Sequence, residues 1–163
     1  MRAAVLTIST SRARGEGEDE SGRRLSKLAE RLGAEVTGPE VIPDDRAAIS
    51  ERLRSLADDE RCELVLTTGG TGFGPFDVTP EATLAVVERH APGIGEAMRA
   101  ASRDHTRHWM LSRGVAGIRG STLIVNFPGS PASIEQAGEA IVDALPHALE
   151  LISGGGAHHH HHH

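Results

Sequence analysis

Four glycines stand within six residues in the segment Gly69-Gly70-Thr71-Gly72-Phe73-Gly74, and Asp77 follows it. Glycines let a chain approach a ligand closely, and the free N–H groups of such a loop can surround an anion. The common fingerprints do not fit, because Pro75 breaks G-x-G-x-x-G and no P-loop lysine follows. A plain tight connection would need only two glycines. The spacing therefore favours a backbone cradle for phosphate.

Two aspartates could add a cation to this cradle. Asp77 ends the glycine loop, and Asp44 follows an earlier apolar run. Mg²⁺ usually takes one or two carboxylates together with phosphate oxygens and water. Each aspartate could instead be an ordinary turn or capping residue, and Asp44 taken alone fits that role better. If both lie at one edge of a sheet, they can share a Mg²⁺ ion that bridges nucleotide phosphates.

A second turn, Pro128-Gly129-Ser130-Pro131, repeats the arrangement on a smaller scale. A strand-like run precedes it, and a hydroxyl residue followed by proline is typical of a helix start. Helix N-terminal amides bind anions. The turn taken by itself could equally be an ordinary helix start.

The elements that must position these residues alternate between strands and helices. Apolar runs predict strands at 3–8, within 34–42, at 62–68 and at 121–127. Amphipathic spacing predicts five helices. The first is capped by Ser21, the second begins after Pro43, and the third is capped by Thr79 and ends at 91–93. The fourth covers 94–103, and the last begins at Ser130 and breaks at Pro146. This alternation is typical of an α/β fold with a mostly parallel sheet flanked by helices.

Ligands of such sheets bind at the carboxyl ends of the strands. The loops 9–20, 43–45, 69–79 and 127–130 are therefore expected to form one site. Within the first of them and the helix that follows, Arg12, Arg14, Arg23 and Arg24 flank four carboxylates, those of Glu16, Glu18, Asp19 and Glu20. Mixed charge is typical of a solvated loop, and a clamp for an anionic substrate is the alternative.

Composition excludes several classes of protein. A net charge of −6 disfavours nucleic acid or an anionic membrane as the main partner, and no apolar run reaches the ~20 residues of a membrane helix. One cysteine, Cys62, forms no internal disulfide, so we expect a cytoplasmic protein with Cys62 in the core. His105 and His108 could share a metal on a helix, but no third ligand lies nearby in the sequence, so we expect them at the surface or at an interface. We expect one domain over 1–153, a tail or linker over 154–157 and a histidine tag over 158–163.

Taken together, the motifs resemble one family. The segment Leu66-Thr67-Thr68-Gly69-Gly70-Thr71-Gly72, followed by Asp77-Val78-Thr79-Pro80-Glu81-Ala82-Thr83, closely resembles the signature of the MogA/MoaB family of molybdopterin adenylyltransferases, also found as the G domain of gephyrin-type fusion proteins. The resemblance continues in order through residues 5–9, 19–22, 92–93, 111–113, 116–120 and 126–131. It covers nearly the whole untagged chain.

The resemblance implies a three-layer fold, usually trimeric, that transfers AMP from ATP to molybdopterin with Mg²⁺ and releases pyrophosphate. It implies that Asp77 and Asp44 are catalytic and bind the metal. The residues that it places at the nucleotide or the pterin are Ser9, Asp19, Ser21, Gly69, Gly70, Thr71, Gly72, Ser112, Arg113, Pro128, Gly129 and Ser130. A molybdate-insertion enzyme is an expected partner.

One residue departs from the family pattern. Phe76 precedes Asp77 where the family commonly has arginine. A cation there would stabilise charge on a polyphosphate, and Arg113, Arg119 or an arginine of a neighbouring subunit could replace it. The alternative is a MoaB-type protein that binds molybdopterin with weak or no adenylylation. Phe73 and Phe76 are expected to pack against a partner subunit rather than to flank a ligand ring.

Overall fold

The computed structural model describes residues 1–154. Its elements are, in chain order, β1 (Arg2–Ile8), α1 (Thr10–Ala13), α2 (Glu20–Arg31), β2 (Glu35–Ile42), α3 (Arg46–Asp58), β3 (Leu64–Thr68), α4 (Thr79–Leu84), β4 (Arg89–His90), α5 (Pro92–Ser102), the 3-10 helix η1 (Trp109–Leu111), β5 (Ala116–Arg119), β6 (Thr122–Phe127), α6 (Pro131–Ile141) and α7 (Leu145–Ile152). The predicted tail beyond Gly154 and the histidine tag lie outside the described residues.

One sheet of six strands forms the centre of the fold, in the order β2-β1-β3-β6-β5-β4. The first four of these strands are parallel, and β5 and β4 add an antiparallel edge. The prediction of a mostly parallel α/β sheet is confirmed. The antiparallel edge was not predicted, because β4 has two residues and Gly117 interrupts the apolar run of β5.

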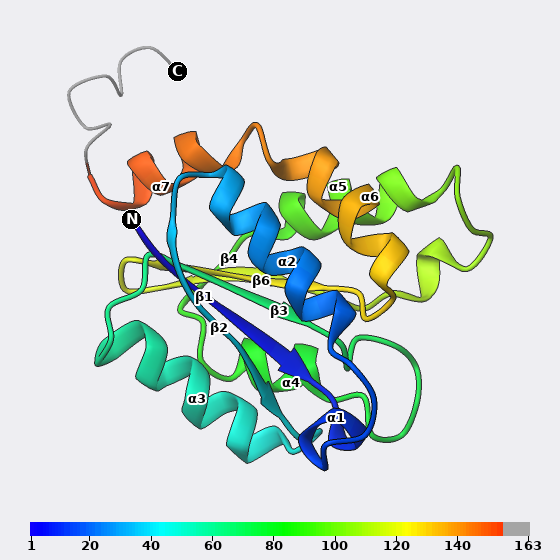
Figure 1. The fold of residues 1–163 in the computed structure, drawn as a ribbon. Helices are drawn as coiled ribbons and strands as arrows, with labels where there is room; N and C mark the ends of the chain where they lie inside the picture. Colours follow the sequence, from blue (N-terminus) through cyan, green and yellow to red (C-terminus); the bar gives the residue numbers. More distant parts are fainter. Residues whose placement is uncertain (155–163) are drawn as a thin grey trace.

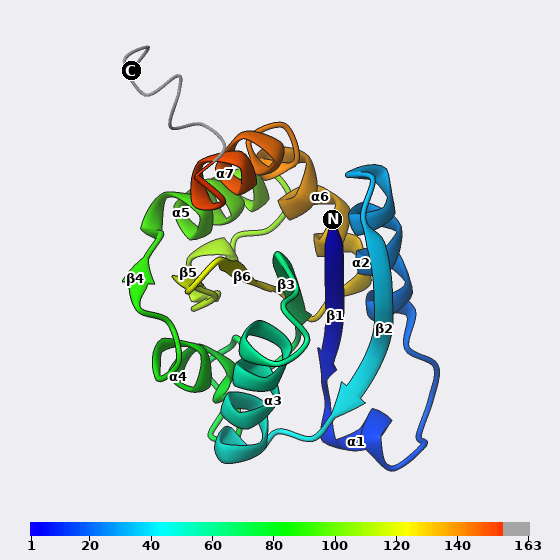
Figure 2. The ribbon, with the colours of Figure 1, turned by 90° about the vertical axis from the view of Figure 1, so that its left-hand side faces the viewer.

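Helices cover both faces of the sheet and make three layers (Figures 1 and 2). On one face α2, α5, α6 and α7 pack on side chains of β1, β3 and β6, with Phe127 among the largest buried residues. On the other face α3 and α4 pack on the alternate side chains of the same strands. Cys62 belongs to this second core cluster, as predicted, and burial raises the pKa of its thiol. No helix of residues 1–154 is long and apolar enough to cross a membrane.

Three helix starts differ from the prediction. The N-cap of α2 is Asp19, whose carboxylate accepts a hydrogen bond from the Gly22 amide at 3.0 Å, and Ser21 lies inside the helix. The N-cap of α4 is Val78 rather than Thr79, with no side-chain capping bond. Asp45, not Asp44, caps α3. In the first two cases the predicted capping hydroxyl makes a tertiary contact instead.

Two segments differ in their extent. The predicted loop 9–20 contains a short helix, α1, because the Ser9 hydroxyl caps it by accepting from the Arg12 amide at 3.2 Å. The helix expected to run from Thr79 to 91–93 ends at Leu84, and the chain continues into β4. The predicted division at Pro146 is confirmed, since α6 ends before it and α7 carries the proline in its first turn.

Candidate functional site

The loops that follow the parallel strands meet at one edge of the sheet. The Ser9 amide donates to the Ile42 carbonyl at 2.9 Å, which joins the ends of β1 and β2. The Thr68 hydroxyl donates to the Pro128 carbonyl at 2.7 Å, which joins the ends of β3 and β6. The juxtaposition expected from the topology is therefore present.

Thr79, which follows the glycine loop of residues 69–77, holds the first two residues of that loop. Its hydroxyl donates to the Gly69 carbonyl at 2.9 Å, and its amide donates to the Gly70 carbonyl at 3.1 Å. Gly70 has φ of 69°, and a Cβ there would overlap the Thr79 hydroxyl. The backbone therefore requires glycine at this point. Residues 73–76 are exposed, so the loop is not covered by packed side chains.

Asp44 lies beside this loop. Its Oδ2 accepts hydrogen bonds from the amide and the hydroxyl of Thr10, each at 3.0 Å. Its Oδ1 lies 3.3 Å from the position that a Cβ of Gly70 would occupy, and it has no hydrogen-bond donor among residues 1–154. One carboxylate oxygen is thus anchored while the other remains available to a ligand.

Asp77 has a similar arrangement at the far end of the loop. Its Oδ2 accepts a hydrogen bond from the Gly74 amide at 2.9 Å. The same oxygen lies 2.9 Å from the position that a Cβ of Gly72 would occupy. Its Oδ1 takes no hydrogen bond from the described part of the chain. Asp44 and Asp77 therefore flank alternate glycines of one loop, each with one free oxygen.

These oxygens have the right chemistry for a hard divalent cation. Mg²⁺ binds through one or two carboxylates and takes its other ligands from phosphates and water. Within residues 1–154, no group of three or more His, Cys, Asp or Glu side chains could hold a metal by itself. The two aspartates therefore fit a Mg²⁺ ion that arrives with a nucleotide better than a resident metal.

Arg113 clamps the glycine loop from outside. Its Nε donates to the Gly72 carbonyl at 2.8 Å, and Nη2 donates to the Asp77 carbonyl at 2.8 Å. Its Nη1 pairs with a carboxylate oxygen of Glu81 at 2.6 Å, and its amide donates to the Thr71 carbonyl at 2.7 Å. Arg113 lowers the pKa of Glu81. This arginine orders the loop, so its guanidinium is not free to replace the cation missing at position 76.

Arg119 is also committed elsewhere. It binds the Asp58 carboxylate through Nε at 3.1 Å and Nη2 at 2.8 Å, and Nη1 donates to the Val86 carbonyl. Neither of the two arginines named as replacements therefore presents a free guanidinium in the described chain.

The two phenylalanines of the glycine loop lie at the surface. Phe73 is 68% exposed and Phe76 is 76% exposed.

A cleft of about 320 Å³, here called the edge cleft, opens beside Gly69. It is lined by residues 7–9, 11–12, 18–21 and 68–69 together with Gly129 and Pro131. Five predicted site residues line it: Ser9, Asp19, Ser21, Gly69 and Gly129.

Two of those residues build the cleft wall. The Asp19 carboxylate accepts from the Thr7 hydroxyl at 2.7 Å, and the Ser21 hydroxyl donates to the Gly129 carbonyl at 2.7 Å. Both contacts hold the start of α2 against the strand ends. The sequence pattern did not reveal them, because each partner lies far away in the chain.

Other predicted residues lie outside the edge cleft. Ser112 and Pro128 line a separate cavity of about 130 Å³ beside Trp109 and Arg99. Arg99 donates to the Ser112 carbonyl at 3.3 Å. Ser130 is exposed at the N-cap of α6 and makes no side-chain capping bond. The turn after β6 thus separates two cavities rather than completing one.

The pattern did not single out Thr10 or Glu81 as site residues, although Thr10 holds Asp44 and Glu81 holds Arg113. A hydroxyl directly after a strand end was the available signal for Thr10. No local signal marks Glu81, which resembles any acidic residue in a first helical turn. His105 and His108 are exposed, as expected.

Comparisons with known proteins agree on one family. A family model described as a probable molybdopterin binding domain matches residues 4–147. The molybdopterin adenylyltransferase of Helicobacter pylori strain J99 is 39% identical over 155 residues, which cover 92% of this chain and 86% of that protein. The enzyme of the same name from Escherichia coli K12 is 38% identical over 171 residues, covering 94% and 86%.

A solved structure supports the same assignment. The molybdopterin biosynthesis enzyme MoaB from Thermus thermophilus superposes with a TM-score of 0.88 at 43% identity, covering 94% of this chain and 96% of that one. The fold, the order of motifs and these relatives lead to one conclusion. The chain belongs to the family of molybdopterin-binding domains that includes MogA and MoaB.

Proposed function

We propose that this protein is a molybdopterin adenylyltransferase that transfers AMP from ATP to molybdopterin. The observation that carries the proposal is the pair Asp44 and Asp77, each anchored by one oxygen and free at the other, beside alternate glycines of an exposed loop. The relatives in Helicobacter pylori and Escherichia coli carry this name.

In the proposed reaction a phosphate oxygen of molybdopterin attacks the α-phosphorus of ATP. A new P–O bond forms there, the bond to the bridging oxygen of the β-phosphate breaks, and pyrophosphate leaves. Such a transfer depends on positioning and charge neutralisation more than on a protein nucleophile. The glycine loop would hold the phosphates through backbone N–H groups, and Arg113 would keep that loop in place.

A Mg²⁺ ion bound with ATP would neutralise phosphate charge. Asp44 and Asp77 would hold it through their free carboxylate oxygens. Thr10 and the Gly74 amide would keep the two side chains oriented by occupying the other oxygens. No histidine or serine base is required.

Substitution of the two aspartates tests this proposal. Asp77→Asn and Asp44→Asn should each lower the rate of adenylyl-molybdopterin formation at least about 100-fold with little change in melting temperature, because each removes a charged oxygen from the metal. Asp45→Asn is the matched control, since asparagine also caps helices and the charge lost is one residue away. Undiminished turnover in Asp77→Asn would contradict the proposal.

A second candidate function is a MoaB-type protein that binds molybdopterin with weak or no adenylylation. Phe76, in the position where the family commonly has arginine, and the engagement of Arg113 and Arg119 in internal contacts favour it. Calorimetry separates the two functions. The transferase should bind both ATP with Mg²⁺ and molybdopterin, whereas the second candidate should bind only molybdopterin.

We further propose a single domain over residues 1–153 that acts as a homotrimer. The exposed rings of Phe73 and Phe76 would be covered by a neighbouring copy. A cytoplasmic location suits the single buried thiol of Cys62. The adenylylated product would be consumed by an enzyme that inserts molybdate.

A further inference from the structure

A phosphate bound at this edge of the sheet would be stabilised by a cation. A guanidinium can serve only if its N–H groups are not already used. Arg113 and Arg119 spend theirs on carbonyls and carboxylates. A cation for this phosphate, if this chain supplies it, would therefore come from another arginine at the same edge of the sheet.

Arg12 is the arginine that lines the edge cleft, beside Ser9 and Gly69. Its side chain makes one hydrogen bond among residues 1–154, from Nη1 to the Glu16 carbonyl at 3.1 Å, and no ion pair. Most of the N–H groups of its guanidinium thus remain available. Arg12 lies on the same short helix, α1, as Thr10. Thr10 donates to Asp44, and Asp44 lies beside Gly70 of the glycine loop, so α1 is held next to that loop.

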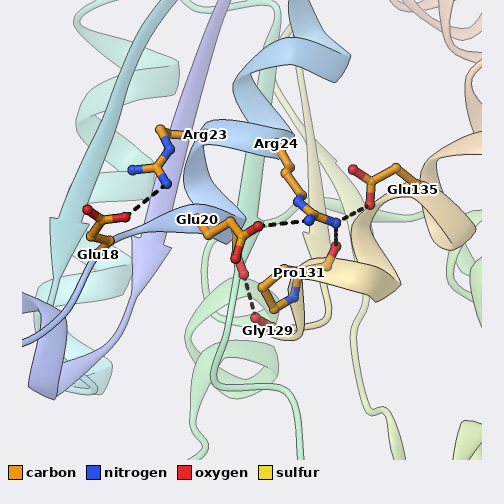
Figure 3. Close-up of polar contacts among 8 residues, drawn as sticks. Glu18, Glu20, Arg23, Arg24, Gly129, Pro131 and Glu135 are labelled. Atoms are coloured by element: carbon orange, nitrogen blue, oxygen red, sulfur yellow. Dashed lines mark hydrogen bonds and ion pairs between the residues drawn. The ribbon is translucent and has the colours of Figure 1, made fainter.

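The carboxylates of the same cleft do not neutralise Arg12. Glu18 pairs with Arg23 at 3.4 Å, and Glu20 pairs with Arg24 at 2.7 Å (Figure 3). Arg24 also pairs with Glu135 on α6 at 3.2 Å. The arginines of all these pairs lie on α2. The mixed-charge segment therefore divides into the paired Arg23 and Arg24 on α2 and two arginines without an ion pair among residues 1–154, Arg12 and Arg14, of which Arg12 lines the cleft.

Asp19, the remaining acidic residue of the cleft, is also engaged. Its two oxygens accept hydrogen bonds from the Gly22 amide and the Thr7 hydroxyl. An anion in the edge cleft would thus meet the unused N–H groups of Arg12 and the hydroxyls of Ser9 and Ser11. The other hydroxyls of the cleft already donate within the protein, and its acidic residues are engaged by protein donors. That environment suits a phosphate group.

We infer that Arg12 is the phosphate-binding residue of the edge cleft. The inference rests on the proposed function and identifies which group of the substrates the edge cleft receives. The phosphate could belong to the triphosphate of ATP or to molybdopterin. The chemistry of the contact is the same in both cases, a bidentate guanidinium on phosphate oxygens.

The test is calorimetry of wild type, Arg12→Ala, Arg12→Lys and Arg14→Ala with two ligands, ATP with Mg²⁺ and molybdopterin. Arg14 is the matched control, because it carries the same charge two residues away and does not line the cleft. Arg12→Ala should raise the Kd of one ligand about tenfold or more. Arg12→Lys should recover part of the loss, and Arg14→Ala should stay within about twofold of wild type.

The two ligands distinguish the two sources of phosphate. Weaker binding of ATP alone assigns Arg12 to the triphosphate, and weaker binding of molybdopterin alone assigns it to the pterin's phosphate. Unchanged Kd values for both ligands in Arg12→Ala would overturn the inference, as would an equal loss in Arg14→Ala. Failure of the wild type to bind either ligand would instead overturn the proposed function itself.

Discussion

The two flanks of the candidate site are built in different ways. On the glycine-loop flank, internal contacts hold the charged groups in place: Arg113 holds three carbonyls and Glu81, and each aspartate spends one oxygen on an internal donor and keeps the other free. On the edge-cleft flank, Arg12 keeps most of its donors unused. The difference suggests that the first flank positions a metal and a reacting phosphorus, whereas the second binds a charged end of the substrate.

This contrast separates two kinds of substitution effect. Loss of a loop contact should lower kcat, because reacting groups held out of place react slowly even when the substrate is bound. Loss of a cleft contact should mainly weaken binding. Substitutions on the glycine-loop flank test this difference.

The largest effect is expected from Gly70→Ala. The new Cβ would meet the Thr79 hydroxyl at a positive φ and would approach Asp44, so the loop must move away from Asp44 and displace Asp77. Adenylylation should fall at least about 100-fold, and unfolding free energy by about 2 kcal/mol or more. Gly120→Ala is the control, since Gly120 also has positive φ but no atom near its Cβ position. Gly120→Ala should lower the unfolding free energy by about 1 kcal/mol and leave the adenylylation rate unchanged.

Kinetic assays and thermal melts of both variants measure these effects. If Gly70→Ala behaved like Gly120→Ala, the close packing around the loop would have no catalytic importance, and the proposed division between the flanks would be wrong.

An intermediate effect is expected from Arg113→Lys. Lysine keeps the charge but cannot reach the Gly72 and Asp77 carbonyls and Glu81 at once. We expect kcat to fall about tenfold with a smaller change in KM, because the loop is less ordered while its amides remain. Arg119→Lys is matched, since it breaks a similar fork on Asp58 away from the loop. A rise in KM at constant kcat would instead assign Arg113 to substrate binding.

The smallest effect concerns the pH dependence of the Arg113–Glu81 pair. Arg113 holds the pKa of Glu81 below its ordinary value of 4.5, so the folded state favours the charged carboxylate. The stability from this pair is present above pH 4.5 and is lost as the pH falls through the lowered pKa. Glu81 is 40% exposed, so we expect less than about 1 kcal/mol.

Denaturant unfolding of wild type and Glu81→Gln at pH 7 and in the acid range isolates this contribution. The difference between the two proteins should shrink as the pH falls. A difference that stays constant with pH would mean that Glu81 acts through packing rather than through its charge.

The sequence alone determined the α/β class, the four loops at one sheet edge, and the glycine loop with its two aspartates. These follow from local patterns, namely apolar runs, glycine spacing and the rule that parallel strands end at one edge. The same logic predicted the break at Pro146, since proline interrupts a helix wherever it lies.

Tertiary structure alone decided what individual polar side chains do. Ser21 and Thr79 look like helix caps in the sequence, yet their hydroxyls reach Gly129 and Gly69. Arg113 looks like a free cation for substrate, yet it clamps the loop, while Arg12 in a charged stretch faces the cleft. The reason is that a donor takes the best acceptor within reach, and reach depends on residues as far apart in the chain as Ser21 and Gly129.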